Sequence, residues 1–152
     1  MPSEFIQRQK DDFFRDLTSF GSLWFYIILM LFFLIQENYQ VFKKLIAGFV
    51  LIYGITIIIR SIWFKNRPKK YSYNNYIEKL DAASFPSLHA TRISFLGLFF
   101  ASYFNNFMLS FLIVVLVLIV LYARTYLKKH DWKDVIAGFI IGILVYLAVN
   151  LI

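Results

Sequence analysis

The chain contains two histidines, and each lies where a polar stretch meets a long apolar segment. His89 follows Ser87 and Leu88, whereas His130 stands six residues after Arg124 and directly before an Asp-Trp-Lys-Asp run. Imidazole changes charge near neutral pH and can act as a nucleophile, an acid or a base. Arginine matches phosphate oxygens with paired N–H donors. These residue types therefore predict chemistry on a phosphate ester or anhydride.

A third polar cluster ends another apolar segment and holds Arg60 and Arg67. Phosphoryl transfer depends on fixed positive charge around the phosphoryl oxygens. We expect Arg60, Arg67 and Arg124 to bind those oxygens. The hydroxyl of Ser87 and the backbone amide of Leu88, at a predicted helix N-terminus, add donors of the kind that hold anions.

The spacing of His130 and Asp134 predicts a catalytic pair. Residues four apart lie on one face of a helix, so the carboxylate would bind one imidazole nitrogen and leave the other as nucleophile. His89 would protonate the leaving oxygen as a general acid. The two imidazoles must then differ in protonation, which predicts a bell-shaped dependence of the rate on pH.

The composition places these groups in a membrane. Of the 152 residues, 60% are hydrophobic and 20% are aromatic, far above the average of soluble domains. The chain has no cysteine, which excludes disulfides, thiolate metal sites and cysteine nucleophiles. The net charge of +7 suits membrane lipids with anionic head groups and phosphorylated lipids. We expect no nucleic-acid partner, because no soluble basic domain is present.

Five apolar segments are long enough, or nearly so, to cross a bilayer, which takes about 20 residues. They cover residues 20–36, 45–64, 87–104, 107–127 and 135–152. Charged and apolar side chains are interspersed at roughly helical spacing before them, at 5–19, which predicts an interfacial amphipathic helix. The expected fold class is all-α: a multi-pass transmembrane helical bundle of about five spans plus this N-terminal helix, in a single domain over residues 1–152.

The number of spans brings the polar clusters together. Only Asn105 and Asn106 separate the third and fourth segments, so these should form an antiparallel helical hairpin. With five spans, the end of the second, the start of the third, the end of the fourth and the start of the fifth open on the same side. The three polar clusters therefore converge on one membrane face, although they are far apart in sequence.

These clusters resemble the three signature motifs of the type 2 phosphatidic acid phosphatase family. The family's motifs are Lys, six residues, Arg-Pro; then Pro-Ser-Gly-His; then Ser-Arg, five residues, His, three residues, Asp. The matching positions in this chain are Arg60 with Arg67-Pro68, then Pro86-Ser87-Leu88-His89, then Ala123-Arg124 with His130 and Asp134. Order and spacing agree throughout, and the three motifs together are specific.

The resemblance implies a role for each matched position. His130 would form a phosphohistidine with Asp134 as its orienting partner, His89 would be the general acid, and the remaining groups would bind phosphate. The family also implies a phosphatase that needs no metal and no cofactor. The layout is similar to small undecaprenyl-pyrophosphate phosphatase members. We therefore expect a polyprenyl pyrophosphate as substrate, with phosphatidate or phosphatidylglycerophosphate as the alternative.

Three positions depart from the family pattern: Arg60 replaces lysine, Leu88 replaces glycine and Ala123 replaces serine. Arginine keeps the charge of lysine but changes its shape. The leucine side chain must fit where the backbone approaches the phosphate, and a positive φ would be costly there. A non-catalytic lipid-phosphate binder, with Leu88 blocking turnover, is therefore the second hypothesis.

Two further features have simple structural explanations. A single arginine near a membrane interface is usually a lipid-facing anchor, and we expect this of Arg92. Gly138 and Gly142 form a pair of small residues that favours close helix packing inside the bundle, with a homodimer seam as the alternative.

The side of the membrane that carries the site is predicted differently by two arguments. The site's side holds 14 of the 16 Lys and Arg residues, and the positive-inside rule places that side in the cytoplasm. The resemblance implies the outer face of the cell membrane. Basic residues gathered for a phosphorylated substrate distort the charge count, so we expect the outer face.

Overall fold

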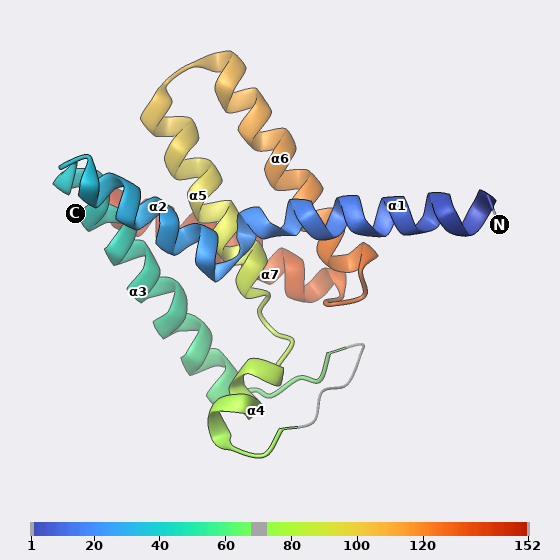
Figure 1. Ribbon diagram of the computed structural model, residues 1–152. Coiled ribbons are helices and arrows are strands. Elements are labelled where there is room, and N and C mark those ends of the chain that lie inside the picture. Colours follow the sequence, from blue (N-terminus) through green and yellow to red (C-terminus); the bar gives the residue numbers. More distant parts are fainter. Residues whose placement is uncertain (1, 68–72, 152) are drawn as a thin grey trace.

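The computed structural model describes residues 2–67 and 73–151, so Pro68 of the first motif lies outside the described residues. The regular structure in these ranges is helical (Figure 1). In chain order the elements are α1 (Pro2–Leu17), the 3-10 helix η1 (Thr18–Gly21), α2 (Leu23–Ile35), α3 (Tyr39–Ile62), α4 (Tyr76–Ala82), α5 (Leu88–Phe104), α6 (Phe107–Tyr126) and α7 (Trp132–Asn150). The all-α fold class is confirmed.

Each of the five expected apolar segments forms a helix, and a polar side chain marks where each helix begins. The side chain accepts a hydrogen bond from a backbone N–H in the first turn, which satisfies a donor that the helix itself leaves without a partner. These capping residues are Ser22, Asn38, Ser87, Asn106 and Asp131. The short helix α4, within the loop between the second and third segments, was not expected.

The predicted hairpin of α5 and α6 is confirmed (Figure 1). Asn105 ends α5 in the left-handed region, with φ 46° and ψ 40°, which asparagine tolerates better than most residues. The side chain of Asn106 then accepts a hydrogen bond from the amide of Leu109 at 3.0 Å. Two asparagines thus reverse the chain and start the next helix.

Within residues 2–67 and 73–151, three helices have the length and composition to cross a membrane: α3, α6 and α7. A fourth candidate span joins residues 4–21 to α2, with a bend of 45° between the two parts. The helix α5 is only 17 residues long, and its polar residues Thr91, Arg92 and Ser94 are buried against other helices. The protein is therefore a multi-pass integral membrane protein in which α5 is shielded by its neighbours.

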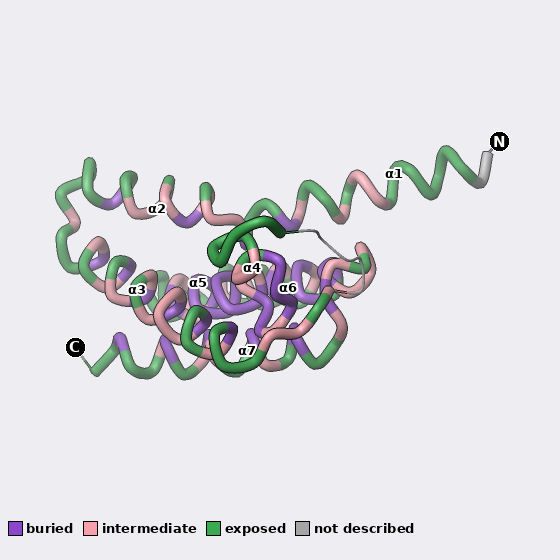
Figure 2. Tube along the Cα trace, turned by 90° about the horizontal axis from the view of Figure 1, so that it is seen from below, coloured by how far each residue is buried: buried purple, intermediate pink, exposed green. Residues whose placement is uncertain are grey.

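The centre of the bundle is the packing of α5 against α7, and Figure 2 shows α5 as the most continuously buried helix. Gly138 and Gly142 on α7 face α5 at close range. A Cβ added to Gly138 would lie 2.6 Å from the carbonyl oxygen of Ser87, and one added to Gly142 would lie 2.7 Å from that of Thr91. The glycine pair therefore serves packing inside the bundle; the homodimer expectation remains untested.

Candidate active site

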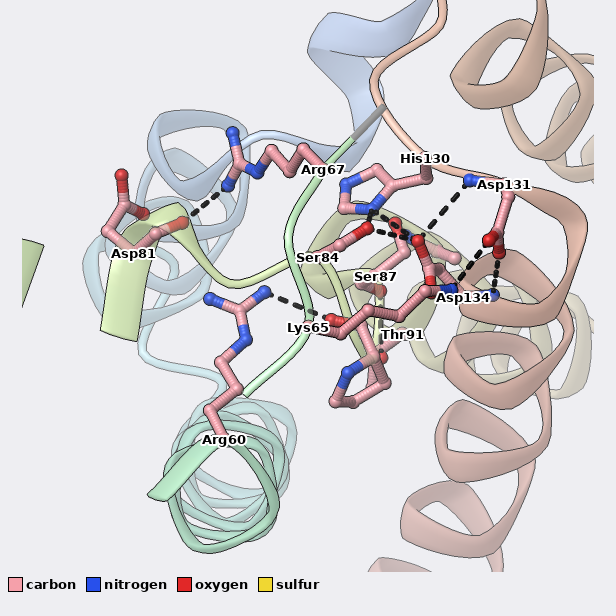
Figure 3. Close-up of polar contacts among 12 residues, drawn as sticks. Arg60, Lys65, Arg67, Asp81, Ser84, Ser87, Thr91, His130, Asp131 and Asp134 are labelled. Atoms are coloured by element: carbon pink, nitrogen blue, oxygen red, sulfur yellow. Dashed lines mark hydrogen bonds and ion pairs between the residues drawn. The ribbon is translucent and has the colours of Figure 1, made fainter. Parts of the chain in front are cut away.

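His130, Asp134 and Ser84 form a buried cluster at the start of α7. His130 Nδ1 lies 3.6 Å from Oδ2 of Asp134. Ser84 Oγ lies 3.4 Å from the same nitrogen and donates a hydrogen bond to the same carboxylate oxygen, so the hydroxyl bridges the two groups (Figure 3). The Nδ1 side of the ring is thus occupied, which leaves Nε2 as the nitrogen available for chemistry.

The expectation that His130 and Asp134 share one helix face is wrong, because α7 begins only at Trp132. Asp131 caps the helix: its side chain accepts a hydrogen bond from the Asp134 amide at 3.0 Å, and Asp134 Oδ2 accepts one from the Asp131 amide at 3.3 Å. This reciprocal capping box turns the Asp134 carboxylate back toward the residues before the helix. The His130–Asp134 pair therefore comes from the helix cap.

Lys65 supplies a positive charge beneath this pair. Its Nζ lies 2.6 Å from Oδ2 of Asp131 and 2.6 Å from Oδ1 of Asp134. Burial opposes a charged ammonium, but the hydrogen bonds with the two carboxylates outweigh it and raise the pKa of Lys65. Sequence reasoning missed both Lys65 and Ser84, although each stands two residues before a motif residue, Arg67 and Pro86 respectively.

The surroundings of His130 favour its neutral form. Burial lowers the pKa of His130 below its ordinary value of 6.5; the contact with Asp134 opposes this shift, and the positive charges of Arg124 and Arg67 add to it. A neutral imidazole keeps a lone pair, which a nucleophile requires. The arginines that would bind phosphate therefore also favour the reactive state of the ring.

The second motif is tied directly to the third. The amide of Ser87 donates to the carbonyl oxygen of Asp134 at 3.1 Å, and the hydroxyl of Thr91 donates to the carbonyl oxygen of Ser87 at 3.0 Å. Ser87 is also the N-cap of α5, so the first amides of this helix have no acceptor within it. A helix N-terminus, a feature that can bind anions, is thus positioned beside the His130 cluster.

The leucine and alanine that depart from the family pattern fit this geometry. Leu88 packs against the apolar core cluster around Tyr26 and Phe95, and it is not among the described residues with positive φ. Glycine is therefore not needed for the backbone conformation at this position. Ala123 is fully buried on α6, directly before Arg124.

The three arginines of the motifs do not make equivalent contacts. Arg60 is buried on α3 and donates to the carbonyl oxygens of Leu80 and Pro86, at 2.8 Å and 3.0 Å. Arg67 donates to the carbonyl oxygen of Asp81 at 2.6 Å. Arg60 thus braces the backbone that leads into the second motif, a contact that differs from the expected role as a phosphate ligand.

Arg67 and Arg124 act on both imidazoles. The positive charges of Arg124 and Arg67 oppose protonation of both rings, and His130 also opposes protonation of His89. Arg124 is buried at the end of α6, and its carbonyl oxygen accepts a hydrogen bond from the His130 amide at 3.2 Å. The expected convergence of the motifs on one end of the bundle is therefore observed, with two histidines around shared positive charge.

Arg92 was expected to be a lipid-facing anchor, and this is wrong. Its side chain is buried, with 4% exposure, one helical turn after His89 on α5. Arg92 Nη2 lies 3.3 Å from His89 Nδ1, and Nη1 donates to the hydroxyl of Tyr53 at 2.7 Å. The arginine therefore belongs to the site.

Among the cavities of the described residues, one opens at the site and another lies near it. One, of about 760 Å³, opens beside Arg124 between α1 and the turn from α6 to α7, where Arg15, Lys128 and Lys129 add basic groups. The other, of about 320 Å³, has an apolar lining from α2, α5, α6 and Phe20 of η1. The next residue, Gly21, lies against His89, because a Cβ added to it would be 3.0 Å from the His89 carbonyl oxygen.

Comparisons with known proteins agree with this arrangement. The profile of the PAP2 superfamily matches residues 45–152. The fold is similar to that of the first transmembrane PAP2 type phosphatidylglycerolphosphate phosphatase from Bacillus subtilis, with a TM-score of 0.74 and 18% sequence identity, over 93% of this chain and 75% of that chain. No curated protein matches the chain. Because the family profile covers more than half of the chain, including all three motifs, this protein belongs to the PAP2 superfamily.

Proposed function

We propose that this protein is a metal-independent phosphatase that removes phosphate from a lipid phosphate or pyrophosphate at one membrane face. The observation that carries the proposal is the buried His130, whose Nδ1 faces Ser84 and Asp134 while Arg67 and Arg124 act on the ring. Membership of the PAP2 superfamily supports the reaction class.

In the first step, Nε2 of His130 attacks phosphorus, and the bond between phosphorus and the leaving oxygen breaks. His89 assists that oxygen with a proton or a hydrogen bond. Asp134 and Ser84 stabilise the positive charge that develops on the His130 ring, because both contact its Nδ1 edge. In the second step, water attacks the phosphohistidine, inorganic phosphate leaves and His130 is regenerated.

The phosphoryl oxygens would be held by Arg67, Arg124, the Ser87 hydroxyl and the Leu88 amide. Guanidinium groups and helix N-termini stabilise the charge of a transferring phosphoryl group where water is excluded. Arg60, which donates to two backbone carbonyls, would hold the Pro86 segment in place for these contacts.

A lipid substrate fits the two neighbouring cavities. The apolar cavity is lined by Phe20, whose neighbour Gly21 lies against His89, and would take a hydrocarbon chain. The basic cavity beside Arg124 would take a polar head group. A polyprenyl pyrophosphate is our first choice. A phosphatidylglycerophosphate is the second, because the similar solved fold is described as a phosphatase of that lipid.

The decisive experiment is phosphate release from a panel of lipid phosphates by the purified protein, with a chelator present. We expect release by the wild type and its loss in His130→Ala, by about 10³-fold or more. Lys133→Ala is the matched control, because this lysine lies three residues away on α7 with an exposed side chain. Activity retained in His130→Ala would refute the nucleophile. A protein that binds lipid phosphates without releasing phosphate would instead be the non-catalytic binder.

We place the site on the outer face of the cell membrane. The chain has no cysteine, so a single Tyr73→Cys substitution gives one labelling position in an exposed stretch just before α4. Labelling of intact cells by a membrane-impermeant maleimide is the expected result. Labelling only after the cells are opened would place the site in the cytoplasm.

A further inference from the structure

The contact between Arg92 and His89 decides where His89 carries its proton. Arg92 Nη2 lies 3.3 Å from His89 Nδ1. A guanidinium group has only N–H donors and stays protonated in proteins, so it cannot accept a hydrogen bond. The imidazole nitrogen must therefore be the acceptor. With Nδ1 bare, the single ring proton of His89 sits on Nε2, and the ring is neutral.

Contacts with Tyr53, which we call the clamp, hold Arg92 in place so that its contact with His89 persists. Its other terminal nitrogen, Nη1, donates to the hydroxyl of Tyr53 on α3 at 2.7 Å, and its guanidinium carbon lies 5.9 Å from the centre of the Tyr53 ring. The Tyr53 ring in turn packs on Phe49, with ring centres 4.5 Å apart. Burial of Arg92 to 4% exposure keeps water from replacing either partner. The clamp thus spans α3 and α5.

Other groups act on His89 from other elements. Besides Arg92 on its own helix, the main ones are Arg124 from α6, Arg67 from the segment before α4, and His130 from the turn before α7. Counting Arg92, three of the four groups are arginines and therefore permanent cations.

A neutral Nε2–H imidazole is a good hydrogen-bond donor but a poor acid, as in enzymes that use neutral histidine to polarise an oxygen. The weak acidity of neutral His89 affects two leaving groups differently. A lipid phosphomonoester must expel an alkoxide, whose basicity approaches that of hydroxide (about 15.7 for the pKa of water), and this requires a proton. A lipid pyrophosphate expels a lipid monophosphate, whose second pKa is about 6, and needs only a hydrogen bond.

We infer that Arg92 is a positioning residue that holds His89 as the neutral Nε2–H tautomer, so that the site cleaves the phosphoric anhydride of a lipid pyrophosphate in preference to a lipid phosphomonoester. This inference rests on the proposed phosphatase function. In the favoured reaction His130 Nε2 bonds to the terminal phosphorus as the anhydride P–O bond breaks. The electron pair stays on the bridging oxygen, and the lipid monophosphate leaves as an anion that keeps the hydrogen bond from His89.

The tautomer can be tested without turnover. The chain has two histidines, so nitrogen-15 labelling of histidine gives two imidazoles, and His130→Asn assigns the signals of His89 by subtraction. We expect His89 at neutral pH to show a bare Nδ1 and a protonated Nε2, and to lose this preference in Arg92→Met. A doubly protonated His89 in the wild type, or a proton on Nδ1, would overturn the inference.

The substrate preference is tested by comparing kcat/KM for a polyprenyl pyrophosphate and for the polyprenyl monophosphate with the same chain. We expect the wild type to favour the pyrophosphate by about 10²-fold or more, the scale of general-acid catalysis. Arg92→Met frees Nδ1 for a proton and should narrow this preference by about tenfold, whereas Arg92→Lys keeps a donor and should narrow it less. His89→Gln retains an N–H donor and should lose more activity on the monophosphate than on the pyrophosphate.

Two outcomes separate the inference from the proposed function. Release from neither substrate would refute the phosphatase itself. Release from the monophosphate at an equal or higher rate, with the ratio unchanged in Arg92→Met, would refute the role of Arg92 alone. Tyr53→Phe is the milder variant if Arg92→Met does not fold, because it removes one hydroxyl from the clamp and should narrow the preference in the same direction.

Discussion

At Gly138 on α7, one added methyl group should displace the two histidine motifs relative to each other. A Cβ there would lie 2.6 Å from the carbonyl oxygen of Ser87 and 2.9 Å from Cβ of Ala90. Real Cβ contacts stay at or above 3.0 Å, so Gly138 and Ser87 must move apart by at least 0.4 Å, the difference between 2.6 Å and 3.0 Å. The obstacle is helix backbone, which cannot swing away as a flexible side chain can.

The displaced residue is the N-cap of α5, and its amide donates to the carbonyl oxygen of Asp134 at 3.1 Å. Gly138→Ala should therefore shift the start of α5, which we propose to bind phosphate, relative to His130. A misplacement approaching 1 Å costs about 10²-fold in rate, so we expect a loss of about 10- to 100-fold in kcat/KM. Overpacking of this kind also lowers stability by about 1–3 kcal/mol.

The assay is phosphate release and thermal unfolding of the purified protein, with two comparisons. In Gly54→Ala the added Cβ meets nothing within 4 Å, so activity and melting temperature should stay at or above the wild-type values. Gly142→Ala presses on the Thr91 carbonyl, one turn farther from Ser87, and should lower the melting temperature with a smaller loss of activity. Full activity in Gly138→Ala would refute the reasoning that this contact sets the spacing of the motifs.

Three further outcomes are expected. Ser84→Ala removes the hydroxyl between His130 and Asp134 and should lower kcat about tenfold with little change in KM, measured by steady-state phosphate release. Lys65→Met leaves two carboxylates without their ammonium partner and should lower the free energy of unfolding by about 1–3 kcal/mol, whereas an unchanged melting temperature would contradict this. Because the folded-state pKa of His130 is below 6.5, the ring stays neutral at lower pH than a free histidine, so the acid limb of kcat/KM should lie below pH 6.5. The same shift means that the unfolded chain binds the proton more readily, so the contribution of His130 to stability should fall as pH drops through and below 6.5.

Most helices could be predicted from the pattern of apolar residues alone. The expected segments 87–104 and 107–127 correspond to α5 (Leu88–Phe104) and α6 (Phe107–Tyr126) within one residue at each end. The segment expected from residue 45 begins earlier, at Tyr39, because Asn38 caps the helix and the polar residues of its first turn are compatible with a membrane boundary. The pattern did not reveal α4, which is short and lies among charged and aromatic residues.

The composition of the site was only partly predictable. The motif spacing predicted that His130, Asp134 and His89 lie at one end of the bundle, and the hydrogen bond between Ser87 and Asp134 joins their two segments there. The catalytic roles of these residues remain predictions. Ser84 and Lys65 were missed, since a lone serine and a lone lysine in a polar loop have no periodic signal. Their importance arises from a capping box and a loop path that depend on contacts between distant segments.

By itself, the order of apolar and polar residues predicted an all-helical membrane protein, which is confirmed, and predicted that its three polar motifs meet at one membrane face. The reason is that a bilayer admits only helices or closed barrels, and the number of crossings assigns each polar end to a side. Tertiary structure alone decided what each group does there. Whether an arginine faces lipid, braces a carbonyl or, like Arg92, sets the tautomer of a histidine depends on the residues that packing places within 3–4 Å of it.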